Sequence, residues 1–192
     1  IKLIEKSINA KGKQFIGVMQ RNLHSPYEKN YKGREEFVVY DENVIERKEK
    51  AINSYDNAML YEDYLLSSLI TYIKNSNRSI VLIITADHGQ LLGENNLFGH
   101  NILEFDTAKV PFMVYTHNYK LNFDNISENI SHYEIGKFAA KIIGFDINNL
   151  NDDGVYFIQG NDIYSDNFII PFVRKGHYIE LKKLNTVKNY YR

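Results

Sequence analysis

The stretch Ile80-Val-Leu-Ile-Ile-Thr-Ala-Asp-His-Gly89 decides how the fold of this chain is interpreted. It opens with a continuous apolar run, and a strand that is apolar on both faces is typical of a central, usually parallel, sheet covered by helices. Asp87, His88 and Gly89 follow where that strand ends. In open α/β sheets, sites lie just beyond the carboxyl ends of the strands. A carboxylate beside an imidazole supplies two ligands suited to zinc or manganese, so the stretch predicts a metal site at a sheet edge.

Outward from this stretch, short apolar runs alternate with helical patterns. Phe15–Gln20 and Val110–Tyr115 have the length and composition of strands. The segment from Val44 to Asn75 has helical spacing, and Tyr133–Ile143 is a second amphipathic segment that ends near Gly144. This order predicts an α/β layered domain with a mostly parallel sheet flanked by helices.

The C-terminal part of the chain has a different pattern. Val155–Ile158, Phe168–Val173 and His177–Leu181 are short β-type runs separated by Gly, Asn and Asp, which predicts a small antiparallel meander. Because no repeat or low-complexity linker divides the chain, we expect residues 1–192 to form a single domain. Its opening residues have the character of the tail of a helix. We therefore expect a longer parent protein whose membrane or targeting segments lie upstream.

The composition fits a globular protein and excludes several classes of function. The 192 residues are 44% hydrophobic and 24% charged, which suits one domain with a core. The formal net charge is −1 and the basic residues are scattered, so there is no nucleic-acid-binding signature. Because Cys is absent, disulfides and thiolate metal ligands are excluded within the chain. No apolar run approaches the roughly 20 residues that span a bilayer.

The long predicted helix carries one carboxylate that needs a partner. Asp63 falls four residues after Met59, on or beside the apolar stripe, where a buried charge must be paired. We expect Asp63 to make a structural hydrogen bond to a neighbouring loop, with a role in the site as the alternative. The predicted stripe consists of Ile52, Tyr55, Met59, Leu66, Leu69, Ile70 and Ile73.

Two further histidines stand where the same site could use them. The loop Gln90–Gly99 is punctuated by glycine and ends in His100, which Asn101 follows. Folded back over the Asp-His pair, His100 would supply a cationic or hydrogen-bonding group for an oxyanion. His24 follows the end of the predicted strand Phe15–Gln20. Two strand ends that carry histidine at one sheet edge form an arrangement suited to a phosphate or sulfate site.

Taken together, these motifs resemble those of the bacterial phosphoethanolamine transferases. Asp87-His88-Gly89, Leu92-Gly93-Glu94-Asn95 and Gly99-His100 resemble that family's Ser-Asp-His-Gly-Glu-Ser-Leu-Gly-Glu-Asn-Gly pattern, which ends in Leu-His-Gly. The segment Tyr55–Tyr64 resembles its Tyr-Asp-Asn and Tyr-x-Asp helix, His24-Ser-Pro-Tyr27 its His-Gly-Pro turn, and Val110-Pro111 the opening of its next strand. The resemblance covers roughly residues 13–116. It implies the alkaline phosphatase/sulfatase superfamily, of whose catalytic domain this chain would be the C-terminal portion.

The resemblance also implies an activity: transfer of phosphoethanolamine from a phospholipid to an envelope glycan or lipid A, through a phosphoenzyme. It implies that Asp87 and His88 bind a catalytic zinc, with manganese or calcium as alternatives. His24 and His100 would contact the phosphoryl group or the leaving oxygen, and Asn101 would join them in binding substrate. Such a metal lowers the pKa of a nucleophilic hydroxyl and neutralises charge on the phosphoryl oxygens. A bacterial inner-membrane protein with a periplasmic catalytic domain is likewise implied.

The sequence departs from the family pattern at several positions. Ala86 replaces the usual Ser, Gln90 the usual Glu, and Asn101 a Gly that often follows the histidine. The family's nucleophilic threonine and its acidic metal ligand belong before the His-Gly-Pro turn, and nothing in residues 1–14 matches them. We therefore expect the 192-residue chain by itself to be inactive and to hold zinc weakly.

Other interpretations stay open. A sulfatase shares the fold and the metal pair, although its loop usually leads to a lysine where this chain has His100. A glycerophosphate transferase or another phosphodiesterase of the superfamily is a second alternative. A non-catalytic α/β domain that binds a phosphorylated glycan or a protein partner is a third. We expect the remaining histidines, His117, His132 and His177, to be structural or exposed.

Overall fold

The computed structural model describes residues 2–121, 131–147, 155–161, 164, 167–175 and 178–181. The chain divides into two compact units, which are Ile1–His100 with Lys109–Lys120 and Asn101–Ala108 with Leu121–Arg192. No helix in the described ranges combines the length and the apolar character that a membrane crossing requires.

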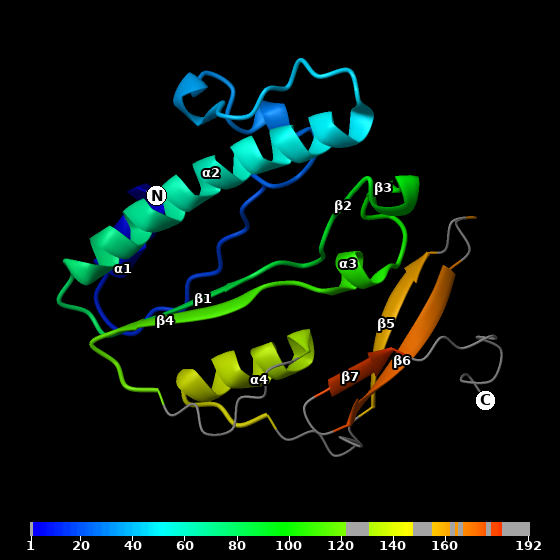
Figure 1. Cartoon of the computed structure of the whole chain (residues 1–192). Coiled ribbons are helices and arrows are strands. Elements are labelled where there is room, and N and C mark those ends of the chain that lie inside the picture. Colours follow the sequence, from blue (N-terminus) through cyan, green and yellow to red (C-terminus); the bar gives the residue numbers. More distant parts are fainter. Residues whose placement is uncertain are drawn as a thin grey trace. The chain divides into compact units, whose positions relative to one another are not determined.

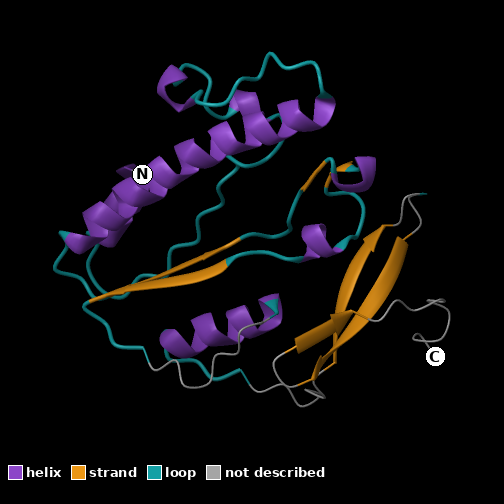
Figure 2. Cartoon of the chain, in the orientation of Figure 1, coloured by secondary structure: helices purple, strands orange, loops and turns teal. Residues whose placement is uncertain are grey.

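The first unit is built on one long helix, α2 (Arg47–Lys74), and a two-stranded sheet (Figures 1 and 2). The side chain of Glu46 accepts a hydrogen bond of 2.6 Å from the backbone N–H of Glu49 and so caps the start of α2. The prediction of a helix from Val44 to Asn75 is therefore confirmed within three residues at either end. The other elements of the unit are α1 (Lys2–Ile8), η1 (Tyr27–Lys29), η2 (Glu35–Phe37), β1 (Ile80–Thr85), β2 (Leu91–Leu92), η3 (Glu94–Asn96), β3 (Phe98–Gly99) and β4 (Phe112–His117).

The sheet of the first unit pairs β1 with β4 in antiparallel register, with Ile80 opposite His117 and Thr85 opposite Phe112. The apolar run that starts at Ile80 and the predicted strand Val110–Tyr115 both form strands, and β4 begins after Pro111. Proline has no N–H to contribute to a ladder, which fits this start. The expected parallel sheet is not seen, because every strand pair among the described residues is antiparallel.

The prediction of a strand at Phe15–Gln20 is wrong for this structure. The segment belongs to no strand, and all of its residues are exposed, including Phe15 at 72% and Met19 at 88%. A β-prone run forms a strand only where a neighbour pairs with its backbone, and no such ladder forms here.

The direction of the Phe15–Gln20 segment can nevertheless be followed through its contacts. At its start, the Arg78 guanidinium, just before β1, donates to the Gly12 carbonyl. At its end, His24 lies beside His100, whose ring stacks on His88 just after β1. The two contacts therefore place the residues before and after this segment near the start and the end of β1, in the same order along the chain.

Two clusters of buried residues lie along α2. Towards its C-terminal end, Leu69 and Ile73 pack with Ile8 of α1, as the predicted stripe requires. Towards its N-terminal end, Ala58 packs with Tyr27 and Tyr31. Partly buried neighbours are Ile4, Tyr72, Ile80, Leu82 and Tyr115 in the first cluster, and Leu23, Tyr55, Tyr61 and Leu92 in the second.

The N-terminal half of the predicted stripe needs correction. Met59 is 40% exposed, and Asp63 is also exposed. Among the described residues, Asp63 makes none of the structural hydrogen bonds that we expected of it. The buried carboxylate is its neighbour Glu62, at 9% exposure. The buried line here runs through Ser54, Ala58 and Glu62, because this half of the helix faces polar loops whose backbone and amide groups need partners.

The second unit contains the predicted meander. Strands β5 (Val155–Asn161), β6 (Asn167–Lys175) and β7 (Tyr178–Leu181) form an antiparallel sheet in the order β5-β6-β7, which confirms the expectation. Helix α4 (His132–Ile142) confirms the second predicted helix, and it starts with a capping box between Ser131 and Glu134. The unit also contains the short helix α3 (Phe105–Ala108).

Candidate functional site

Three histidines that are distant in the sequence meet in the first unit. The rings of His88 and His100 are stacked, with centroids 4.0 Å apart and an interplanar angle of 21°. The ring of His24 meets that of His100 edge-on, with centroids 5.5 Å apart. His24 lies in the turn that follows the segment Phe15–Gln20. His88 follows β1, and His100 follows β3. The structure thus brings together the three histidines that the sequence analysis expected at one site, although the segment before His24 is not a strand of the sheet.

Each of the three imidazoles directs its Nδ1 atom at an oxygen. His24 Nδ1 lies 2.6 Å from the Ser25 carbonyl, and His88 Nδ1 lies 2.8 Å from the Gly89 carbonyl. His100 Nδ1 lies 3.1 Å from Oε1 of Gln90. Because carbonyl and amide oxygens only accept hydrogen bonds, each neutral ring carries its proton on Nδ1 and a lone pair on Nε2. This is the tautomer in which histidine can bind a metal or accept a proton through Nε2.

Asp87 lies next to this cluster and is open to solvent. Its side chain is 85% exposed, and its Oδ1 accepts a hydrogen bond of 3.1 Å from the His88 N–H and lies 3.8 Å from His88 Nε2. One carboxylate and neighbouring imidazoles are donors that suit zinc. Within the ranges that the structure describes, however, no three His, Asp or Glu side chains are arranged to hold a metal ion together. Asp87 and His88 therefore supply two suitable donors without a complete metal site.

The surroundings of His100 lower its pKa and so favour the neutral ring. Burial is the main cause that lowers its pKa, and the neighbouring His88 and His24 lower it further, while Asp87 acts in the opposite direction. Asn101, the remaining residue predicted to bind substrate, is exposed and is the first residue of the second unit.

Helix α2 holds the turn that carries His24. The two carboxylate oxygens of Glu62 accept hydrogen bonds from Nε2 of Gln20, at 3.1 Å, and from Nδ2 of Asn22, at 2.9 Å. The amide of Asn22 also donates to Oε1 of Gln20, which closes a ring of three side chains. The backbone N–H of His24 donates in turn to the Arg21 carbonyl, at 3.0 Å. Glu62, which the sequence analysis passed over, thus anchors the chain on both sides of Arg21.

The N-terminal end of α2 supports the hairpin of β2 and β3, which leads to His100. The Arg47 guanidinium lies over the Phe98 ring, 4.1 Å from its centroid. Gly93 has φ of +119° and packs against the Lys48 side chain, where an added Cβ would lie 2.6 Å from Lys48 Cγ. Glu94 Oε2 accepts a hydrogen bond of 2.6 Å from the Leu92 N–H. Gly93 and Glu94 of the Leu-Gly-Glu-Asn motif therefore have a structural role here. They set the conformation of the hairpin and its packing against α2.

Asn57 is a second residue whose role the sequence did not reveal. Its side chain is fully buried. Its Oδ1 accepts from the backbone N–H of Val39, at 3.0 Å, and of Tyr40, at 2.9 Å, while its Nδ2 donates to the Tyr40 carbonyl and to Glu42. The Tyr-Asp-Asn motif was the available signal, and its asparagine folds the preceding loop onto α2.

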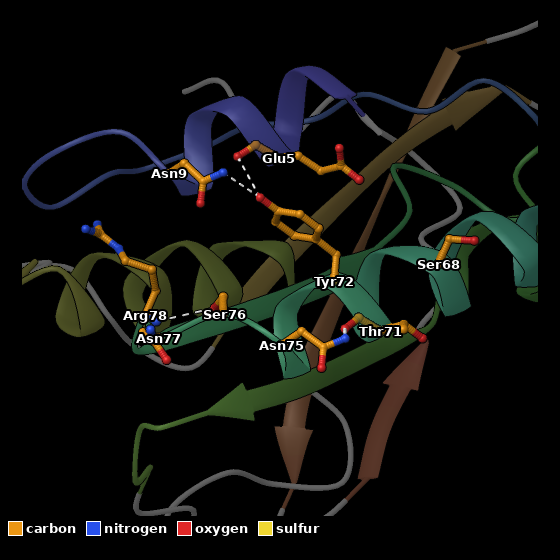
Figure 3. Close-up of a pocket in the computed structure, with 9 residues that line it drawn as sticks. All are labelled: Glu5, Asn9, Ser68, Thr71, Tyr72, Asn75, Ser76, Asn77 and Arg78. Atoms are coloured by element: carbon orange, nitrogen blue, oxygen red, sulfur yellow. Dashed lines mark hydrogen bonds between the residues drawn. The ribbon is translucent and has the colours of Figure 1, made fainter.

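The cavity drawn in Figure 3 lies elsewhere in the first unit. It has a volume of about 580 Å³ and lies between α1 and the C-terminal end of α2, where Asn9 donates to the Tyr72 hydroxyl at 2.6 Å. Arg78 lines it and precedes β1, whereas His88 follows the other end of that strand. The cavity is therefore separate from the histidine cluster. Its lining residues are Glu5, Asn9, Ser68, Thr71, Tyr72, Asn75, Ser76, Asn77 and Arg78.

Among the described residues, neither His117 nor His132 contacts the histidine cluster. Nε2 of His117, in β4, lies 2.9 Å from the Ser76 carbonyl, which is the structural role that we expected. His132 is the first residue of α4 in the second unit. His177 lies outside the described residues.

Comparison with known proteins identifies the class to which this fold and site belong. The Sulfatase family model matches residues 1–145, so the chain belongs to the sulfatase family. The recognition of the alkaline phosphatase/sulfatase superfamily from the sequence is thus confirmed, and with it an α/β fold class. No solved structure matches the chain.

The curated relatives are phosphoethanolamine transferases. The chain is 39% identical to phosphoethanolamine transferase EptA of Helicobacter pylori over 72 residues, which cover 35% of this chain and 14% of that protein. It is 35% identical to EptA of Salmonella typhimurium over 83 residues, covering 39% of this chain and 15% of that one. A Kdo(2)-lipid A phosphoethanolamine 7''-transferase of Escherichia coli is 28% identical over 115 residues, covering 56% and 20%. The chain thus spans a fifth or less of the length of these relatives.

Proposed function

We propose that this chain carries the metal-site part of a phosphoethanolamine transferase, which moves phosphoethanolamine from a phospholipid to an envelope glycan or lipid A. The observation that supports this most is the meeting of His24, His88 and His100 beyond the carboxyl end of β1, beside Asp87. The names of the relatives point to the same reaction. On this proposal residues 1–192 form one domain, the C-terminal portion of a sulfatase-like catalytic domain with a mostly parallel sheet.

Asp87 and His88 would hold the metal, with zinc preferred and manganese or calcium as alternatives. When bound, zinc lowers the pKa of a nucleophilic hydroxyl and neutralises charge on the phosphoryl oxygens, for a reaction that passes through a phosphoenzyme. Asp87 suits this role because its carboxylate is open to solvent, and His88 because its Nδ1 proton is engaged by the Gly89 carbonyl.

His24 and His100 would act on the phosphoryl group and the leaving oxygen. Each carries a lone pair on Nε2, so each can accept the proton of an attacking hydroxyl and return it to a leaving oxygen. The low pKa of His100 favours the neutral form that accepts a proton. Asn101 would add a hydrogen-bond donor for the substrate. The nucleophile, proposed to be a threonine, the remaining metal ligands and a membrane anchor on the periplasmic side would come from other parts of the whole protein.

The family match also supports a second candidate, a sulfatase or another phosphodiesterase of the superfamily. The same four side chains would serve a sulfuryl ester, because sulfate and phosphate esters present similar tetrahedral anions. A substrate comparison separates the two candidates.

A transfer assay tests the proposal. The full-length protein is incubated with a fluorescent phosphatidylethanolamine and a lipid A acceptor, and formation of the diacylglycerol product is followed, with an aryl sulfate in a parallel reaction. We expect donor cleavage that is lost in Asp87→Asn and reduced by about two orders of magnitude or more in His24→Asn and His100→Asn, with His117→Asn as the matched control. Cleavage of the sulfate alone would favour the sulfatase, and unchanged transfer in Asp87→Asn would refute the metal role.

A further inference from the structure

The cavity between α1 and the C-terminal end of α2 has walls made of hydrogen-bonding side chains (Figure 3). Its lining consists of amides, hydroxyls, one carboxylate and one guanidinium, and the ring of Tyr72 adds an aromatic group. Among the described residues, no aliphatic side chain lines it. A volume of about 580 Å³ is in the range of small-molecule sites. The lining therefore suits a small, strongly polar ligand and not an apolar one.

Hydrogen bonds within the wall fix several of these groups in place. Nδ2 of Asn9 donates to the Tyr72 hydroxyl at 2.6 Å, and Tyr72 packs against the buried cluster at this end of α2. Nδ2 of Asn75 donates to the Thr71 carbonyl at 3.0 Å. Because these side chains are already ordered, a ligand that binds them has less conformational entropy to remove.

Other polar atoms of the same wall are left for a ligand. Within the part of the chain that the structure describes, no hydrogen bond engages Oδ1 of Asn9, Oδ1 of Asn75 or the carboxylate of Glu5. The side-chain amide of Asn77 makes none either. The Arg78 guanidinium uses Nη2 for a bond within the protein and keeps its other donors. The cavity thus offers both acceptors and donors.

We propose that this cavity is a binding site for a saccharide unit. A sugar hydroxyl both donates and accepts, so it can pair with carboxylate and amide oxygens and with amide and guanidinium N–H groups. A phosphate ion would find the Arg78 cation but also the Glu5 carboxylate, and an ammonium group would meet the reverse. A wall that carries both charges among neutral amides and hydroxyls therefore favours a neutral ligand with many hydroxyls.

The saccharide site is distinct from the histidine cluster. Arg78 precedes β1 and His88 follows it, and the six residues of that strand span roughly 20 Å. A sugar in the cavity therefore takes no part in the chemistry and serves to hold a glycan on the protein. The saccharide site itself does not rest on the proposed function, whereas its use for an acceptor glycan does.

Saturation-transfer NMR on the full-length protein, in a detergent without sugar groups, tests the proposal. The probes are N-acetylglucosamine and its β-1,4-linked dimer, with inorganic phosphate and ethanolamine as the competing ligand classes. We expect saturable saccharide binding whose affinity falls about fivefold in Asn77→Ala and in Glu5→Gln, because each loses a hydrogen bond. Asn43→Ala, at an exposed asparagine outside the cavity, is the matched control and should bind normally, as should Asp87→Asn.

Three results would overturn the proposal. They are no saccharide binding, saccharide binding that is unchanged in both cavity variants, and binding of phosphate or ethanolamine that Asn77→Ala abolishes. Loss of folding is not expected to obscure the outcome, because Asn77 is exposed and its side chain makes no hydrogen bond to the described residues.

Kinetics identify the source of the saccharide. If it belongs to the acceptor, Asn77→Ala should raise the KM for a glycan-bearing acceptor about fivefold and leave kcat unchanged. Weakened saccharide binding with an unchanged KM assigns the cavity to a free sugar. If the saccharide binds as expected but the full-length protein transfers no phosphoethanolamine, only the proposed function and the link to the acceptor fail.

Discussion

His88 and His100 stack face to face, with ring centroids 4.0 Å apart. Two imidazolium rings at this distance would repel each other, and burial of His100 adds to the cost of its charge. These surroundings therefore favour the neutral form of the His100 ring. Because the Nδ1 atoms of both rings are engaged by Gly89 and Gln90, the cluster offers Nε2 lone pairs, which suits a cation or the proton of a hydroxyl.

The first prediction concerns the anchor of the His24 turn. In Glu62→Gln, an NH₂ group would replace an oxygen that accepts from Gln20 or Asn22, so two donors would face each other. We expect the free energy of unfolding to fall by about 1–2 kcal/mol. Asp63→Asn, at the exposed neighbouring position, should change it by less than about 0.5 kcal/mol. Urea unfolding of both variants is the measurement, and equal effects would refute the anchor.

The second prediction concerns the asparagine that folds the loop onto α2. Asn57→Ala removes four hydrogen bonds and leaves a cavity at a fully buried position. We expect a loss of about 2–4 kcal/mol in the free energy of unfolding. Asn53→Ala, which removes one bond to the Asp41 carbonyl, should cost about 1 kcal/mol or less. A loss in Asn57→Ala no larger than that in Asn53→Ala would contradict the assignment.

These two residues show where the sequence was informative and where it was not. The 28-residue helix, the apolar run of β1 and the meander follow from periodicity and composition, which are local properties. Glu62 and Asn57 could not be found that way, because their partners lie 15 to 42 residues away in loops without a periodic pattern. An apolar stripe also predicts the wrong buried positions where a helix faces such loops. Met59 and Asp63, which the stripe placed in or beside the core, are exposed here.

The candidate site also has features that the sequence predicted and features that it did not. The sequence indicated that His24, His88 and His100 could lie together, because each follows a strand-like run or a glycine-rich loop. The absence of a strand at Phe15–Gln20 could not be predicted, because pairing depends on a neighbouring backbone and not on the apolar residues of the segment itself.

The third prediction is a loss of stability at alkaline pH. Burial raises the pKa of Tyr27 from 10.0 to about 12, and burial together with Glu42 raises that of Tyr31. The unfolded chain therefore releases these protons first. The contribution of these tyrosines to the free energy of unfolding is fully present below pH 10 and is lost as the pH rises towards 12. For Tyr27 alone the loss is about 2 kcal/mol.

Urea midpoints measured from neutral pH to pH 12 would follow this loss. Tyr27→Phe should flatten the alkaline part of the curve, because the ionisable hydroxyl with the raised pKa is removed. Tyr119→Phe, at a tyrosine that is 41% exposed, should leave the curve unchanged. A stability that stays level up to pH 12 in the unsubstituted chain would contradict the prediction.

The fourth prediction concerns metal binding by the 192-residue chain. Because Asp87 and His88 supply two donors, and the described residues contain no group of three such side chains placed for a metal, we expect zinc to bind weakly. Isothermal titration should give a shallow isotherm that Asp87→Asn weakens further, with the exposed Asp63→Asn as the control. Tight, stoichiometric zinc would show that the chain holds a complete site.

The most direct test of the central claim is the intact mass of the full-length protein after exposure to phosphatidylethanolamine. The proposed mechanism predicts a covalent phosphoethanolamine adduct on a threonine, which Asp87→Ala abolishes because the metal that activates the nucleophile is lost. An adduct that persists in Asp87→Ala, or no adduct together with the mass of a formylglycine residue, would contradict it and point to the sulfatase alternative.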